Sequence, residues 1–132
     1  MSSSRDAVSA VLQLYFDGLY HSDVERLGRA LHSRAIYATV TEGPLTYYTM
    51  DQYLPIVAAR PSPADRGEIR RDAIESIEFA GTAHAFARVR CAIGHKHFTD
   101  LLTLVMDEGR WQILSKVFHF ELEDGPRSKC PT

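Results

Sequence analysis

The chain has 132 residues, of which 45% are hydrophobic and 24% charged, and a formal net charge of −2. This length allows one domain with a hydrophobic core but not two, so we expect a single domain over residues 1–132, with its core at 5–120 and a C-terminal tail at 121–132. The chain has no basic block and no apolar run of about 18 residues, which argues against nucleic-acid binding and against a membrane span.

The first part of the chain predicts two helices. Apolar residues recur at helical spacing from about Arg5 to Tyr20, after a polar lead of serines. Asp23 then occupies an N-cap position, and Val24–Leu31 is expected to form a short second helix.

The middle of the chain predicts a strand at Ile36–Thr41, followed by a turn at Gly43-Pro44 that leads into Leu45–Tyr48. A third helix is expected at Met50–Ala59. Thr49 can cap this helix, and Pro55 inside it predicts a kink. Pro61 and Pro63 then favour an extended connection through a polar stretch to Arg70.

The second half of the chain predicts a series of four antiparallel strands, at Ala73–Phe79, Ala83–Ile93, His97–Met106 and Arg110–Phe120. Helices followed by a long antiparallel sheet are typical of the α+β class. We therefore expect an α+β fold in which the N-terminal helices pack against a curved sheet.

The last two strands meet at Glu108-Gly109, and a two-residue loop would fix their register. The pairs expected from it are Asp107–Arg110, Met106–Trp111, Leu104–Ile113, Leu102–Ser115, Asp100–Val117 and Phe98–His119. A bulge would shift this parity. Both faces of the hairpin are largely apolar, so we expect helices to cover one face and a second subunit to cover the other.

Asp100 is the first candidate functional residue, because a lone carboxylate among leucines is costly unless it is paired or protonated. The expected register places His119 diagonally across from Asp100 on the same face, where it could act as a base oriented by the carboxylate. The same register places Lys116 on the outer face, in a subunit contact or at a solvated edge.

Several aromatic side chains could line a pocket for a flat or apolar ligand: Tyr15, Tyr37, Tyr53, Phe98 and Trp111. Core packing is the other explanation for each of them. His95 and His97 could share one face of a strand, but without a third ligand they do not predict a metal site, and no motif for a cofactor is present.

The remaining candidates have ordinary structural explanations. His32 is expected to pack or cap at the end of the second helix, and Glu42 to be a solvated turn residue. Cys91 has no evident base beside it in the sequence, and Cys130 lies in the tail, which is a poor arrangement for a disulfide. With no secretory signal at the N-terminus, a reduced, cytoplasmic compartment is expected.

Three segments, YFDGLYHSDVERLGRALHSRAIY, TMDQYLPIVAARPSP and FTDLLTLVMDEGRWQILSKVFHF, resemble the nuclear transport factor 2-like superfamily, and within it the putative lumazine-binding, SnoaL-like branch. The resemblance covers about Asp6 to Phe120. It implies a cone in which a curved sheet wraps around helices to form a deep pocket, and a homodimer through the outer sheet face. It does not fix the function, because the superfamily includes both enzymes and non-catalytic binding modules.

The ketosteroid isomerases of this superfamily offer a more specific comparison. Tyr15 falls where those enzymes place an oxyanion-hole tyrosine, and Asp100 falls near their protonated aspartate, the second donor. Thr39 falls at the position of the general base, and a threonine cannot take a proton from carbon at neutral pH.

Two functions are compatible with these residues. The first is a small-molecule-binding domain with an apolar cone pocket, in which polar anchors such as Tyr15, Asp100, Thr39 and His119 orient a flat or apolar cyclic ligand. The second is a cofactor-independent SnoaL-like or ketosteroid isomerase-like enzyme for proton transfer or hydration and dehydration, with Asp100, His119 and Tyr15 as catalytic residues. A dimeric scaffold with a collapsed pocket is a weaker third possibility.

Overall fold

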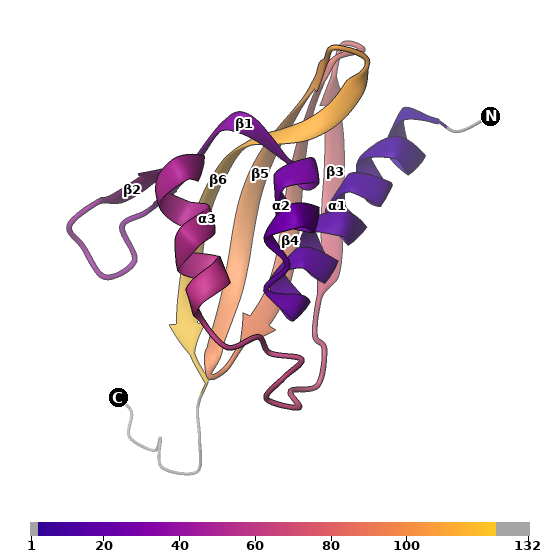
Figure 1. Ribbon diagram of the computed structural model, residues 1–132. Coiled ribbons are helices and arrows are strands. Elements are labelled where there is room, and N and C mark those ends of the chain that lie inside the picture. The colour runs from indigo at the N-terminus through magenta and orange to yellow at the C-terminus, as the bar shows by residue number, and fades with distance from the viewer. Residues whose placement is uncertain (1–2, 124–132) are drawn as a thin grey trace.

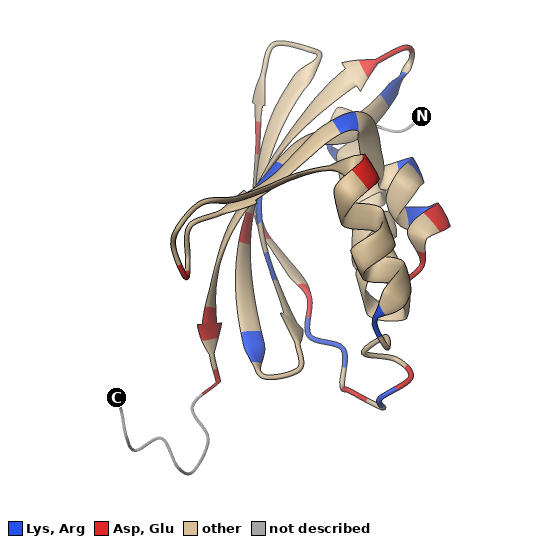
Figure 2. Ribbon diagram, turned by 60° about the vertical axis from the view of Figure 1, so that its left-hand side comes forward, with Lys and Arg blue, Asp and Glu red and all other residues tan. Residues whose placement is uncertain are grey.

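The computed structural model describes residues 3–123. Three helices lie on one side of a six-stranded sheet (Figures 1 and 2). The helices are α1 (Ser4–His21), α2 (Val24–Ala30) and α3 (Met50–Ala59), and the strands are β1 (Leu31–Thr39), β2 (Thr46–Thr49), β3 (Ala73–Ala80), β4 (His84–Ile93), β5 (Lys96–Asp107) and β6 (Arg110–Leu122). No helix of this described part is long and apolar enough to cross a membrane.

Polar N-cap residues mark where the helices begin. Ser3 caps α1, and Asp23 caps α2 with a carboxylate that accepts the backbone N–H groups of Glu25 and Arg26. Thr49 precedes α3. Since such side chains satisfy the free N–H groups of a first turn, the helix starts at Val24 and Met50 could be read from the sequence, and the structure confirms them.

The second helix is one residue shorter than expected, and the strand after it is longer. Leu31 has extended backbone angles and opens β1, which was expected to begin only at Ile36. Leu31 and Ala35 are both buried in the core. Burial of these side chains against the sheet decides the conformation here, because tertiary packing overrides the helical preference of a leucine.

The strand order is β2-β1-β6-β5-β4-β3, so the chain enters the sheet beside its last strand. The predicted antiparallel series is confirmed from β3 to β6. In contrast, β1 runs parallel to β6 and antiparallel to β2, which makes the sheet mixed. Helices on one side of a curved mixed sheet form the expected α+β fold (Figure 2).

A β-bulge at Leu114 divides the final hairpin into two registers. The pairs expected nearest the turn are confirmed as far as Leu104–Ile113, but Thr103 pairs with Ser115, which leaves Leu114 as an extra residue on β6. The three pairs expected farther from the turn are therefore wrong. In the structure, the partners across the hairpin are Leu102–Lys116, Asp100–Phe118 and Phe98–Phe120.

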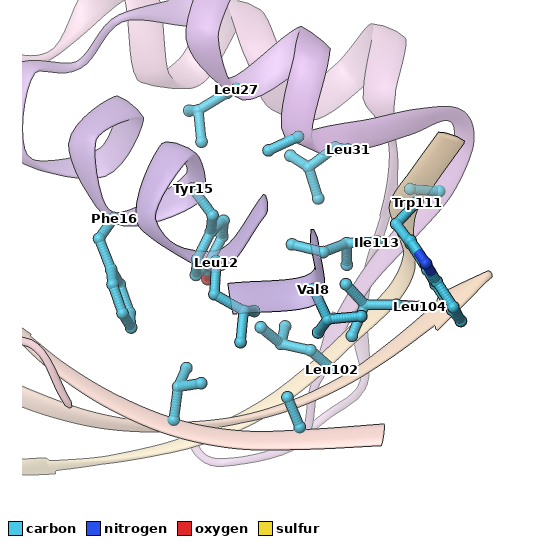
Figure 3. Packing of buried hydrophobic residues seen from close by; sticks show 14 of the residues in the cluster. Val8, Leu12, Tyr15, Phe16, Leu27, Leu31, Leu102, Leu104, Trp111 and Ile113 are labelled. Carbon is cyan, nitrogen blue, oxygen red and sulfur yellow. The ribbon is translucent and has the colours of Figure 1, made fainter. Parts of the chain in front are cut away.

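The core lies between the helices and the inner face of the sheet. In Figure 3, Val8 and Leu12 of α1 lie beside leucines of β5 such as Leu102. Gly18 of α1 lies against Leu27 of α2, and a Cβ at Gly18 would lie 2.7 Å from Leu27 Cγ and 3.1 Å from its backbone nitrogen. The close packing of these two helices therefore requires glycine at this position.

Gly18→Ala is expected to lower the free energy of unfolding by about 1–2 kcal/mol, because overpacking against Leu27 outweighs the better helix propensity of alanine. Gly28→Ala is the matched control: a Cβ at Gly28 meets no atom within 4 Å. There we expect a gain of up to about 1 kcal/mol. Urea unfolding followed by circular dichroism measures both, and equal effects at the two positions would contradict the packing role of Gly18.

Candidate functional site

A fully buried carboxylate lies at the centre of the molecule. Asp100 points inward from β5 with an exposed fraction of 0%, and the Tyr15 hydroxyl of α1 donates a hydrogen bond to its Oδ2 at 2.6 Å. The other oxygen, Oδ1, has no hydrogen-bond partner among the described residues. Burial and the nearby Asp100 raise the pKa of Tyr15 well above its usual value. Tyr15 therefore keeps its proton and donates a hydrogen bond to Asp100.

Lys116 of β6 is also buried, and aromatic rings surround its ammonium group. The side chain is 5% exposed. Its Nζ lies between 5.2 and 5.4 Å from four ring centroids, those of Tyr15, Tyr37, Tyr53 and Phe118. A cation within about 6 Å of a ring face is attracted by the negative face of the ring, and this attraction strengthens when water is excluded. The bulge at Leu114 produces this cage, because it turns Lys116 inward.

The charge of Lys116 has no partner in direct contact within residues 3–123. Its Nζ forms neither a hydrogen bond nor an ion pair within 4.0 Å with any of these residues. Burial opposes the ammonium charge, but Tyr53 and the Asp100 carboxylate outweigh that effect and raise the pKa of Lys116 above its ordinary value. The site therefore combines a buried cation with a carboxylate that acts on it through space.

Lys116 also lines a small inner cavity of about 20 Å³. Other residues that line it are Tyr37, Tyr53, Arg60, Cys91 and Phe98. A wider cavity of about 570 Å³ shares Tyr37, Arg60 and Phe98 with the inner one. The residues that line the wider cavity include those between the end of β4 and the start of β5, and Arg60 at the C-terminal end of α3. Together they form a pocket with a narrow, cationic inner end and a wide outer part.

The structure brings four of the predicted ligand-binding residues to this pocket. Tyr37 stacks on Tyr53 with ring centroids 4.6 Å apart, and Phe98 lines both cavities. Thr39 lines the wider cavity, where its hydroxyl donates to the backbone oxygen of Phe118 at 2.6 Å. At the place expected for a general base, the pocket thus has a hydroxyl that is already hydrogen-bonded.

The other predicted site residues lie elsewhere. Tyr15 and Asp100 are bonded to each other beneath Lys116 and line neither cavity. Trp111 packs in the core against Phe79, with ring centroids 5.9 Å apart. His119 pairs with Thr99 on the outer face of the sheet, so the expected contact between His119 and Asp100 is wrong. The bulge is the reason, because beyond Leu114 it exchanges the β6 side chains that point inward with those that point outward.

The two cationic residues that line the inner cavity were not predicted as site residues. Lys116 was expected on the outer face, and Arg60 follows α3 without any motif around it. The available signal was the spacing of Lys116, Phe118 and Phe120, which alternate on one face of β6 and are all buried. An apolar face that contains one lysine indicates a buried cation only if that face is known to point inward.

The lesser candidates contact nearby polar residues or solvent. His32 contacts Asp107, with 2.8 Å between Nε2 and Oδ2, and Glu42 is exposed. His97 contacts Glu123 at 3.2 Å. Within residues 3–123, no group of three or more His, Cys, Asp or Glu side chains could hold a metal ion. Cys130 lies outside the described residues, so its pairing stays a prediction.

Cys91 is expected to react slowly with alkylating reagents. Burial, followed by the charge of Asp100, raises the pKa of this thiol to about 12. At pH 8 about one thiol in ten thousand is then ionised, and the thiolate is the reactive form. In a Cys130→Ser background, we expect iodoacetamide to react at least about 100-fold more slowly than with free cysteine, and the rate to rise with pH toward 12. A rate that levels off near pH 9 would contradict this prediction.

Comparison with known proteins agrees with this architecture. The family model described as putative lumazine-binding matches residues 3–119. The chain belongs to this family. A search of curated proteins gave no match.

Solved structures similar to this family member include two nuclear transport factor 2-like proteins of unknown function. The protein from Silicibacter pomeroyi is 25% identical, with a TM-score of 0.79, and the match covers 92% of this chain and 100% of that chain. The protein from Shewanella baltica is 26% identical, with a TM-score of 0.78, and the match covers 92% of this chain and 98% of that chain. A ketosteroid isomerase-like protein from Erwinia carotovora atroseptica is 10% identical, with a TM-score of 0.70 over 91% of this chain and 98% of that chain, so it shares the fold alone.

Proposed function

We propose that this protein is a small-molecule-binding domain that holds a flat or apolar cyclic compound in the pocket at the C-terminal end of α3. The observation that carries the proposal is the pocket itself, in which a wide outer cavity leads to a narrow inner end lined by Tyr37, Tyr53 and Lys116. Ligand sites in proteins are typically apolar and aromatic concavities with a few polar groups that fix orientation.

The contacts of the two residues that resemble oxyanion donors favour binding over catalysis. In an isomerase-like reaction, Tyr15 and Asp100 would both donate to the substrate. Here the Tyr15 hydroxyl donates to Asp100 instead, and neither residue lines the pocket. Thr39 supplies no general base. A proton-transfer enzyme therefore remains the alternative, and turnover of a bound ligand would be required to support it.

Ligand binding can be tested by two-dimensional amide NMR with a panel of flat cyclic compounds that includes lumazine, 2-naphthol and indole. We expect at least one compound to shift the amide signals of Tyr37, Cys91 and Phe98. Phe98→Ala should weaken that binding about 10-fold, because an aromatic wall is lost, whereas Phe79→Ala on β3 is the matched control. Shifts confined to residues outside the pocket would overturn the proposal.

We also propose that a second copy of the chain covers the outer sheet face. Phe86 and Val117 lie on that face with exposed fractions of 36% and 43%, and Leu101 lies between them. Apolar side chains on a sheet face without helices are typical of a subunit interface. Sedimentation should give a dimer that Val117→Glu dissociates and that Val40→Glu, in the β1–β2 connection, leaves intact. A monomeric wild-type protein would overturn this proposal.

A further inference from the structure

Two cationic side chains converge on the inner cavity. Lys116 is 5% exposed, and Arg60 reaches the same cavity from the end of α3. The Arg60 Nε atom is shielded from solvent and has no hydrogen-bond partner among the described residues. No carboxylate lines this cavity in the described part of the chain. The inner end of the pocket thus offers N–H donors without acceptors, which is costly in a site shielded from water.

The formal charges of this region do not balance. Lys116 and Arg60 contribute two positive charges to the lining of the inner cavity, and among the described residues no carboxylate lines it. Asp100, which acts on Lys116 through space, contributes one negative charge behind the cavity. The Asp100 carboxylate accepts a hydrogen bond from the Tyr15 hydroxyl and lies beyond ion-pair distance of Lys116. One positive charge is therefore in excess at the inner end of the pocket. A ligand anion that enters the cavity would neutralise this charge, and a ligand cation would be repelled.

The dimensions of the pocket indicate how such a ligand would lie. The inner cavity of about 20 Å³ has room for a group about the size of one water molecule. The wider cavity, of about 570 Å³, has aromatic walls that include Tyr37, Phe98 and Phe118. A small anionic group fits at the inner end, and a ring fits against the aromatic walls outside it. The guanidinium of an arginine matches the two oxygens of a carboxylate in particular.

We propose that the ligand of this pocket is a cyclic carboxylate whose carboxylate group binds between Lys116 and Arg60. This proposal rests on the proposed binding function and names the chemical class of the ligand. Lys116 supplies the buried ammonium and Arg60 the planar donors. The aromatic cage holds Lys116 in place, so the cation is preorganised before the ligand binds.

Matched ligand pairs can separate the charge from the ring. Isothermal titration calorimetry would compare benzoate with benzamide and 2-naphthoate with 2-naphthamide, which differ in charge but hardly in shape. We expect the carboxylate of at least one pair to bind about 30-fold more tightly than its amide, as one charge-assisted contact in a shielded site allows.

Variants then assign the preference to residues. Lys116→Met, which retains length without charge, should remove most of the 30-fold preference and change amide binding less than about threefold. Arg60→Gln should weaken carboxylate binding about 10-fold. Arg34→Gln, at an exposed arginine of β1, is the matched control and should have no effect. Because Arg60 is only half-buried, its variant tests the proposal even if Lys116→Met does not fold.

The outcomes distinguish this proposal from the one on which it rests. Equal binding of acids and amides in the wild-type protein would overturn the carboxylate inference and leave a small-molecule-binding domain. A preference for the acids that survives in both variants would also overturn it, because the anion would then bind elsewhere. Failure of all four compounds to bind would count against both proposals.

Discussion

Replacement of Asp100 by leucine is expected to lower the free energy of unfolding by about 3–5 kcal/mol, although the two side chains are similar in size. Two groups lose their partner at once. The buried Tyr15 hydroxyl loses its only acceptor among the described residues, and Lys116 loses the carboxylate that acts on it through space. A buried polar group without a partner costs about 1–3 kcal/mol, and an uncompensated buried charge costs more.

Urea unfolding followed by the fluorescence of Trp111, the single tryptophan of the chain, measures this loss. Asp65→Leu is the matched control, because Asp65 is exposed and its replacement should change stability by less than about 0.5 kcal/mol. Addition of Tyr15→Phe to Asp100→Leu should recover about 1 kcal/mol, since the orphaned hydroxyl is removed. A loss below about 1 kcal/mol for Asp100→Leu would show that neither neighbour depends on the carboxylate.

The second large effect is expected from Lys116. Lys116→Met alone should lower the free energy of unfolding by about 2 kcal/mol, because the buried Asp100 carboxylate loses the buried ammonium that acts on it through space. In an Asp100→Asn background, the same change should be neutral or stabilising, because no buried formal charge is left unbalanced and asparagine still accepts the Tyr15 hydrogen bond.

A double-mutant cycle of these four proteins measures the coupling between the two charges. We expect a coupling energy of at least about 2 kcal/mol. The raised pKa of Lys116 indicates the same sign, because the folded state favours the ammonium form. Stability from this source is present below the ordinary pKa of lysine and is lost as the pH rises through the higher value in the folded protein. Equal costs of Lys116→Met in both backgrounds would mean that the charges do not interact.

Local sequence signals predicted much of the fold. Polar residues cap the helices at Asp23 and Thr49, and the turn at Glu108-Gly109 has positive φ angles. These features depend on neighbours a few residues away, and the structure confirms them. The position of Leu31 could not be predicted in the same way, because its extended conformation depends on packing against β6, which is distant in the sequence.

The candidate site was harder to predict, for one physical reason. Asp100 was a candidate because a carboxylate among leucines is unusual whichever face of the strand points to the core. The surroundings of Asp100 depend on the register of β6, and Ile113 and Leu114 are both apolar, so no break in the alternation marks the bulge. The expected face therefore contained His119 in place of Lys116. Arg60 was missed because it reaches the cavity only through the packing of α3 on the sheet.

The extra residue at Leu114 affects how this protein can be compared with its relatives. A relative without the bulge would have β6 one residue shorter, and an alignment without a gap would then match inward side chains with outward ones. Lys116 would be matched with a surface position and Val117 with a pocket position. An alignment of family members should therefore place a gap at Leu114 where a relative lacks the bulge, so that inward side chains are matched with inward ones. Two relatives could differ by one deletion in this strand and present opposite chemistry to the same ligand.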